Sequence, residues 1–182
     1  QKKKLKRKLN SKEMRTLTEK GGVELFDDVL HVPLFFMGKG IPSNLKINQL
    51  VSGVDLFPTL LNLTNTSYQN SNIDGIDLHE FMKDVPLKDR CIYIESGGNF
   101  WNEDGKAQGI RTAKYKYLRS KNNPEKNVSL YDISSDPGET KNIADESPEI
   151  IKSLEAILQL IVTKKVNEKD RIKKTVFNNN KF

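Results

Sequence analysis

The chain has 182 residues, a formal net charge of +6, 36% hydrophobic residues and 30% charged residues. A chain of this length can form a domain that buries on the order of 70% of its unfolded surface. No segment approaches the roughly 18 consecutive apolar residues of a membrane-spanning helix, so we expect no membrane span. No apolar segment follows the basic N-terminus, which argues against a signal peptide and favours the C-terminal portion of a longer protein.

Residues 1–20 form a basic arm that we expect to be poorly ordered. Residues 2–8 alone carry six Lys or Arg side chains, and blocks of like charge are usually solvated. The alternative is an arm that binds a polyanion, such as nucleic acid, an anionic membrane surface or an anionic polysaccharide. We do not expect a nucleic-acid partner, because no aromatic residues interleave with these charges.

Residues 21–86 have the pattern of an α/β layer. The continuous apolar run Val32–Met37 predicts a strand that is buried on both faces of a sheet. Pro33 fits only at the first residue of that strand or on an edge. A helix is predicted within Val51–Leu63, where Asp55 is placed to cap the N-terminus.

A short helix over Leu78–Met82 ends this layer, and we place a domain boundary near residue 86. Residues 87–182 are predicted to form a small antiparallel sheet followed by C-terminal helices. The hydrophobic pattern changes there to a period of two residues. It predicts three strands, at Cys91–Glu95, Gly109–Leu118 and Val128–Ile133.

Tyrosines alternate with lysines around Tyr115-Lys116-Tyr117, which predicts one packed face and one solvated face of the strand. After the strands, Ser147 followed by a proline and an acidic residue has the features of a helix start. An apolar stripe continues to Val162 and predicts that this helix packs on the sheet. A separate short helix is predicted over Glu168–Phe177.

Leu130–Asp145 combines a strand, an Asp-Pro-Gly-Glu turn and an Asn-Ile-Ala-Asp segment, and it resembles the signature near the C-terminus of sulfatases, members of the alkaline phosphatase superfamily. Further blocks are similar to that family and occur in the same order. They are Phe26–Leu34, Val51–Leu63 with Asp74-Gly75, and Arg111-Thr112 with Tyr115-Lys116-Tyr117.

The resemblance implies an α/β fold: the end of an alkaline-phosphatase-like α/β catalytic domain, followed by a small antiparallel sheet with a packed C-terminal helix. It also implies hydrolysis of a sulfate ester by a formylglycine nucleophile with a divalent cation, usually calcium. The chain lacks the Cys/Ser-x-Pro-x-Arg motif and the acidic metal cluster of the family. We therefore assign no catalytic or metal-binding residue to this chain, and expect both groups in the N-terminal part of the same protein.

Two residues are candidates for contact with the sulfate ester. Trp101 lies in a long, Gly-rich loop and could stack on a substrate, although it could equally anchor the loop to the sheet. Arg111 follows this loop and could face an anionic substrate, although an ion pair with Asp or Glu is the commoner environment. For Asp27 and Asp28 the favoured interpretation is structural.

Two alternative functions stay open. One is a phosphodiesterase or phosphonate hydrolase of the same superfamily, with a Thr or Ser nucleophile upstream. The other is a non-catalytic fragment whose basic arm binds a polyanion, in which case binding should weaken steeply with salt.

Overall fold

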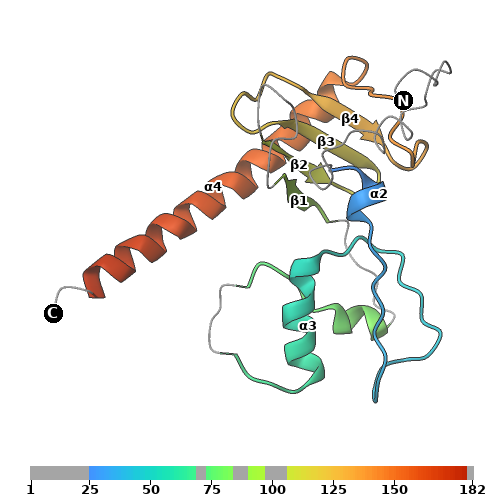
Figure 1. The fold of residues 1–182 in the computed structure, drawn as a ribbon, viewed down its shortest axis with the longest axis vertical. Coiled ribbons are helices and arrows are strands. Elements are labelled where there is room, and N and C mark those ends of the chain that lie inside the picture. Colours follow the sequence, from blue (N-terminus) through green and yellow to red (C-terminus); the bar gives the residue numbers. More distant parts are fainter. Residues whose placement is uncertain (1–24, 69–72, 84–89, 97–105, 180–182) are drawn as a thin grey trace, which may run out of the picture. The chain divides into compact units, whose positions relative to one another are not determined.

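The computed structural model describes residues 25–68, 73–83, 90–96 and 106–179, and the chain divides into two compact units (Figure 1). One unit joins Leu25–Leu30 to the described residues from Tyr93 onward, and the other is His31–Ile92. The predicted basic arm, residues 1–20, and the candidate residue Trp101 lie outside the described residues. The boundary near residue 86 stays a prediction.

The first unit is built on a four-stranded sheet with the order β1-β2-β3-β4. The strands β2, β3 and β4 are antiparallel neighbours, with Ile110 opposite Tyr117 and Tyr117 opposite Leu130. Their bounds are Ile92–Glu95 for β1, Ala107–Arg111 for β2, Tyr115–Ser120 for β3 and Ser129–Asp132 for β4. The predicted antiparallel sheet is thus confirmed, with one strand more than the pattern indicated.

The prediction of a single strand over Gly109–Leu118 is wrong, because a tight turn divides that segment into β2 and β3. The N–H of Thr112 donates to the carbonyl of Tyr115 at 2.8 Å, and the N–H of Tyr115 donates to the Thr112 hydroxyl at 2.8 Å. A threonine side chain that bonds nearby main chain stabilises turns. The period-two pattern continues on both sides of the turn and so conceals it.

The prediction of a solvated lysine face on β3 is also wrong. Lys116 is 0% exposed and Arg119 is 2% exposed, beside the apolar residues Tyr117 and Leu118. Buried cations are tolerated only where carboxylates and hydrogen bonds compensate for lost hydration. Both residues meet this condition, as the contacts below show.

Helix α4, Pro148–Asn179, runs across the sheet and continues beyond it (Figure 1). Arg119 of β3 donates to both carboxylate oxygens of Glu155 on α4, each at 2.9 Å, and the Tyr117 hydroxyl donates to Glu155 at 2.8 Å. The packed C-terminal helix is confirmed, but the separate helix predicted over Glu168–Phe177 is part of α4. In the part of the chain that the structure describes, no helix is long and apolar enough to cross a membrane.

Helix α2, Asp27–Leu30, is a single turn at the edge of the first unit. The N–H groups of Val29 and Leu30 both donate to the carbonyl of Phe26 at 3.0 Å. The Phe26 ring meets the Tyr131 ring edge to face, with centroids 6.0 Å apart. Leu25 packs into a buried cluster with Ala107 and Leu118.

The second unit contains the 3₁₀ helix η1 (Gly53–Asp55), helix α3 (Leu56–Leu63) and the 3₁₀ helix η2 (Leu78–Lys83). Asp55 does not cap α3 with its side chain; instead its carboxylate accepts the Ser52 N–H at 2.7 Å and closes a capping box on η1. The carboxylate also accepts the Ile76 N–H at 3.0 Å and pairs with Arg90 at 2.6 Å. Asp55 thus has a structural role near a helix start, as predicted, but its carboxylate acts from position N3 of η1, whose N-cap is Ser52.

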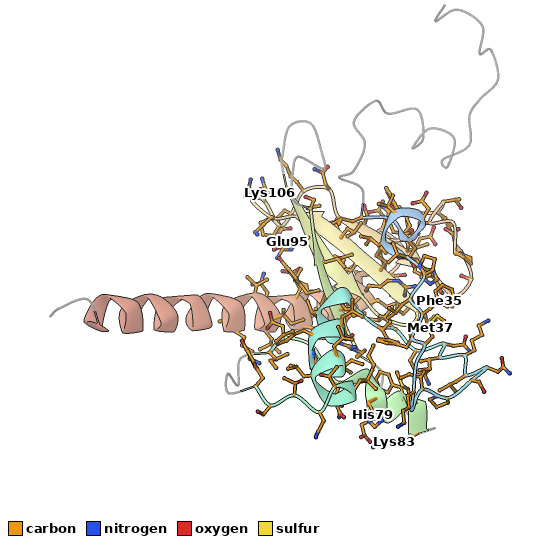
Figure 2. All side chains as sticks on the ribbon, turned by 60° about the horizontal axis from the view of Figure 1, so that its bottom comes forward. Phe35, Met37, His79, Lys83, Glu95 and Lys106 are labelled. Atoms are coloured by element: carbon orange, nitrogen blue, oxygen red, sulfur yellow. The ribbon has the colours of Figure 1, made fainter. Side chains whose placement is uncertain are left out.

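The expectation of a buried strand over Val32–Met37 is not met in this structure. The segment is neither helix nor strand, and its large side chains other than the half-buried Phe36 are exposed, with Phe35 at 84% and Met37 at 92% (Figure 2). A strand buried on both faces needs neighbouring strands and covering helices. Within the described residues of the second unit, no sheet surrounds this segment.

Candidate functional site

The first unit holds a network of four charged side chains, and Arg111 is one of them. Lys116 and Glu139 in this network are buried, and Asp27 and Arg111 are half-buried. Arg111, at the end of β2, donates to Asp27 Oδ2 through Nη2 at 2.8 Å and through Nε at 3.1 Å. The ion pair with a carboxylate is therefore the environment of this candidate residue. Its third guanidinium nitrogen, Nη1, donates to the carbonyl of Thr112.

Lys116 lies at the centre of the network. Its Nζ is 2.5 Å from Asp27 Oδ1 and 2.7 Å from Glu139 Oε1, and it donates to the carbonyl of Leu25 at 2.9 Å. The ammonium group thus makes one hydrogen bond to the main chain and lies within ion-pair distance of two carboxylates. The charge of a lysine with no exposed surface is thus compensated by two neighbouring carboxylates.

Glu139 completes the network from the turn after β4. It is 2% exposed, and its Oε2 accepts the N–H of Asp27 at 2.6 Å. Glu139 has a φ of +52°, a left-handed conformation that non-glycine residues adopt at a cost of about 1 kcal/mol or more. Its N–H donates to the carbonyl of Asp136 at 3.0 Å, which confirms the tight turn predicted at Asp-Pro-Gly-Glu.

The charges of the network balance, with Arg111 and Lys116 opposite Asp27 and Glu139. Burial disfavours the charged form of Asp27, but hydrogen bonds from Arg111 and Lys116 outweigh this effect and hold the pKa of Asp27 below its ordinary value of 3.8. A carboxylate held ionised in this way is a poor general acid. The network therefore has the electrostatics of a structural device.

The residues of this network do not suit the divalent cation that the family resemblance implies. Both carboxylates already face cationic groups, which would repel a metal ion. No group of three His, Cys, Asp or Glu side chains suited to a metal ion occurs among the residues that the structure describes. The described residues do not fit the cation, and we derive no reaction step from it.

Sequence reasoning missed Lys116 and Glu139 as members of a common network. Lys116 lies in an alternating strand, where a lysine normally marks the solvated face, and Glu139 follows a turn. The available signal was that both lie in blocks similar to sulfatases. Their partner Asp27 lies in a third such block.

Residues 23–167 match the model of a protein family described as N-sulphoglucosamine sulphohydrolase, C-terminal. The match covers most of the chain and includes all four residues of the network. The chain belongs to this sulfatase family. The family model is that of a C-terminal region, which confirms the resemblance to the C-terminal portion of sulfatases that the signature at Leu130–Asp145 indicated.

Curated relatives of this sulfatase region include arylsulfatase K of several vertebrates. The chain is 31% identical to the protein of Mus musculus over 146 residues, which are 77% of this chain and 26% of that protein. It is 30% identical to the protein of Gallus gallus, with 77% and 27% of the two chains covered. The chain thus spans about a quarter of the length of these relatives.

Solved structures show the same relationship. A Bacteroides fragilis protein described as a sulfatase matches with a TM-score of 0.51 and 28% identity, covering 60% of this chain and 24% of that one. A 2-O GAG sulfatase matches with a TM-score of 0.50 and 25% identity, covering 64% and 26%. A phosphonate monoester hydrolase of Agrobacterium radiobacter has a TM-score of 0.53, with 65% and 26% covered, but its 21% identity shows a shared fold only.

Proposed function

We propose that this chain is the C-terminal region of an enzyme that hydrolyses sulfate esters. The observation that carries the proposal is the family match over residues 23–167. Relatives named arylsulfatase K and the similarity to a 2-O GAG sulfatase support the same reaction class.

In this proposal the formylglycine nucleophile and the divalent cation, calcium, belong to the N-terminal part of the same protein. The absence of the Cys/Ser-x-Pro-x-Arg motif from this sequence supports that division. When bound, a divalent cation supplies Lewis-acid stabilisation of charge on the sulfuryl oxygens. The role left for the described residues is to complete and hold the fold around a site built elsewhere.

The exposed apolar surface of the second unit supports the N-terminal part as a partner. Soluble proteins rarely leave a large group of apolar side chains in water without a binding partner. Exposed residues of this kind in the unit are Val32, Leu34, Phe35, Met37, Leu45, Val54, Phe57 and Leu60. We propose that the missing part of the catalytic domain covers them, with Val32–Met37 added as a strand of its sheet.

Trp101 and Arg111 remain proposed contacts for the sulfate ester. For Arg111 the ion pair with Asp27 supports the structural alternative. The two roles differ in kinetics: Trp101→Ala should raise KM if the ring stacks on the substrate. It should leave KM unchanged and lower stability if the ring anchors the loop.

The proposal is tested with the full-length parent protein and three esters of one phenol: a sulfate, a phosphodiester and a phosphonate. We expect the sulfate to be hydrolysed most efficiently, and replacement of the upstream Cys or Ser by Ala to abolish turnover. Preference for the phosphodiester or the phosphonate would instead favour the phosphodiesterase or phosphonate hydrolase alternative.

The polyanion-binding alternative is separated by a binding measurement on the same protein. It requires affinity for a sulfated polysaccharide that falls steeply with salt and is lost when residues 1–20 are deleted. A protein that binds in this way and hydrolyses none of the three esters would overturn the sulfatase proposal.

A further inference from the structure

Three stretches that are far apart in the sequence meet in the charge network, which is buried at Lys116 and Glu139. Phe26–Leu34 contributes Asp27, the segment from Arg111 to Tyr117 contributes Arg111 and Lys116, and Leu130–Asp145 contributes Glu139. Each stretch is one of the blocks that resemble sulfatases. Their common feature in this structure is this network.

We propose that Lys116 and Glu139 are positioning residues for the reaction of the parent enzyme, an inference that rests on the proposed function. They hold the main chain of Leu25–Asp27 against the sheet. In doing so they fix the point from which the chain continues into Val32–Met37, the segment proposed to join the catalytic sheet. We call the four side chains Asp27, Arg111, Lys116 and Glu139 the latch.

The latch forms hydrogen bonds with main-chain atoms as well as with side chains. Lys116 donates to the carbonyl of Leu25 across 91 positions of sequence, and Glu139 accepts the N–H of Asp27 across 112 positions. Because the bonds are made to a carbonyl and an amide on either side of Phe26, they fix the direction of the chain there. Buried, charge-assisted hydrogen bonds of this type are stronger than neutral ones.

The turn that carries Glu139 is itself stabilised by hydrogen bonds. The carboxylate of Asp136 accepts the N–H groups of Thr140 at 2.7 Å and Lys141 at 2.9 Å, on the far side of Glu139. These bonds stabilise the left-handed conformation of Glu139 and point its side chain at Asp27. Lys116 is equally fixed, since β3 is paired on both sides, to β2 and to β4.

Between the latch and Val32–Met37, the main-chain bonds seen among the described residues are those of the α2 turn. The turn of α2 is closed by bonds to Phe26 and ends at Leu30. Val32–Met37 itself is exposed and unpaired with any strand among the described residues. Loss of the latch should therefore free the segment that joins α2 to the catalytic part, and a displacement of about 1 Å at a catalytic site can lower turnover by about 100-fold.

The test uses the full-length parent protein and the variant Lys116→Met, which keeps the aliphatic length and removes the charge. Two quantities are measured: amide hydrogen exchange of the peptide containing Asp27, Val29 and Leu30, and kcat and KM for the phenyl sulfate ester. We expect exchange of this peptide to accelerate at least tenfold, while peptides of β2 and α4 stay unchanged. We expect kcat to fall at least tenfold, with KM changed less than threefold.

Lys114→Met is the matched control. Lys114 lies two residues earlier, is largely exposed and reaches Asp132 only at 3.9 Å. This variant should leave exchange, kcat and KM at wild-type values. Glu139→Gln provides a second test if Lys116→Met does not fold, because it keeps the volume and an oxygen for the Asp27 N–H while removing the charge opposite Lys116.

Two results would overturn the inference. Unchanged exchange at Asp27–Leu30 in a folded variant would show that the latch does not hold the segment. Faster exchange with unchanged kcat would show a purely structural role. If the wild-type protein hydrolyses no sulfate ester, the proposed function is wrong and so is the positioning role. The exchange measurement still shows whether the latch restrains the segment Asp27–Leu30.

Discussion

The N–H of Asp27 donates to the carboxylate of Glu139 at 2.6 Å, although 112 positions separate the two residues in the sequence. This bond joins the first turn of the described chain to the turn that follows the last strand. It ties the N-terminal segment of the first unit to the part of that unit that follows the sheet. It also explains why an acidic residue follows Asp-Pro-Gly in this protein: the turn directs its carboxylate into a buried cationic site.

The stability of the first unit should depend on pH through Asp27. The folded-state pKa of Asp27 lies below 3.8, so the unfolded chain takes up a proton first as the pH falls. The stabilisation is therefore complete above about pH 4 to 5 and is lost as the pH falls through the folded pKa. Urea unfolding between pH 7 and pH 2 measures this effect. The free energy of unfolding should be lower for Asp27→Asn than for wild type, and this difference should narrow only at the acidic end of the range. The exposed neighbour Asp28 provides a control, because Asp28→Asn should change the free energy of unfolding much less. Equal effects of the two variants would contradict the assignment of the pH dependence to Asp27.

Glu155→Ala should destabilise the packing of α4. The change leaves the guanidinium of Arg119, which is 2% exposed, without its carboxylate partner. Removal of one member of a fully buried ion pair typically costs about 3–5 kcal/mol, and because Glu155 is 27% exposed we expect a smaller loss of about 1–3 kcal/mol here. Chemical denaturation measures the loss, and Lys152→Ala, an exposed change on the same helix, should alter the free energy of unfolding by less than about 0.5 kcal/mol. A loss of similar size in both variants would argue against the Arg119–Glu155 pair as the anchor.

Two leucines of α4 allow a test of which face packs on the sheet. Leu158 is 0% exposed and Leu160 is 72% exposed. Leu158→Ala removes buried methyl groups and leaves a cavity, at a cost of about 2–5 kcal/mol. Leu160→Ala is the same substitution on the solvated side and should be close to neutral. Thermal or urea unfolding measures both losses. A larger loss for Leu160→Ala than for Leu158→Ala would contradict the packing of α4 described here.

Gly75 should not tolerate a side chain. A Cβ atom built there would overlap the carbonyl oxygen and carbon of Val54, both of which are main-chain atoms. Gly75→Ala therefore requires a backbone shift in the second unit, and we expect a loss of about 2 kcal/mol or more. Gly53→Ala is the control, since nothing lies within 4 Å of the corresponding Cβ. Comparable unfolding midpoints for the two variants would show that the contact relaxes without cost.

Local patterns were sufficient for several elements. Ser147-Pro148-Glu149 marked the start of α4, and Asp-Pro-Gly marked the turn after β4, because helix starts and tight turns depend on a few neighbouring residues. Two boundaries inside regular patterns were missed. The turn at Thr112 and the continuity of α4 through Glu168–Phe177 leave the hydrophobic period unchanged, so periodicity does not reveal them.

The chain's own sequence was enough to establish the sulfatase family and the small sheet with its helix, because ordered motifs and hydrophobic periods are properties of short segments. The burial of Lys116, by contrast, depends on carboxylates from Asp27 and Glu139, which are 112 positions apart in the sequence. The exposure of Val32–Met37 likewise follows from what surrounds the segment and not from its composition. Only the tertiary structure decides such cases, because the free energy of a buried charge or an apolar strand is set by long-range neighbours.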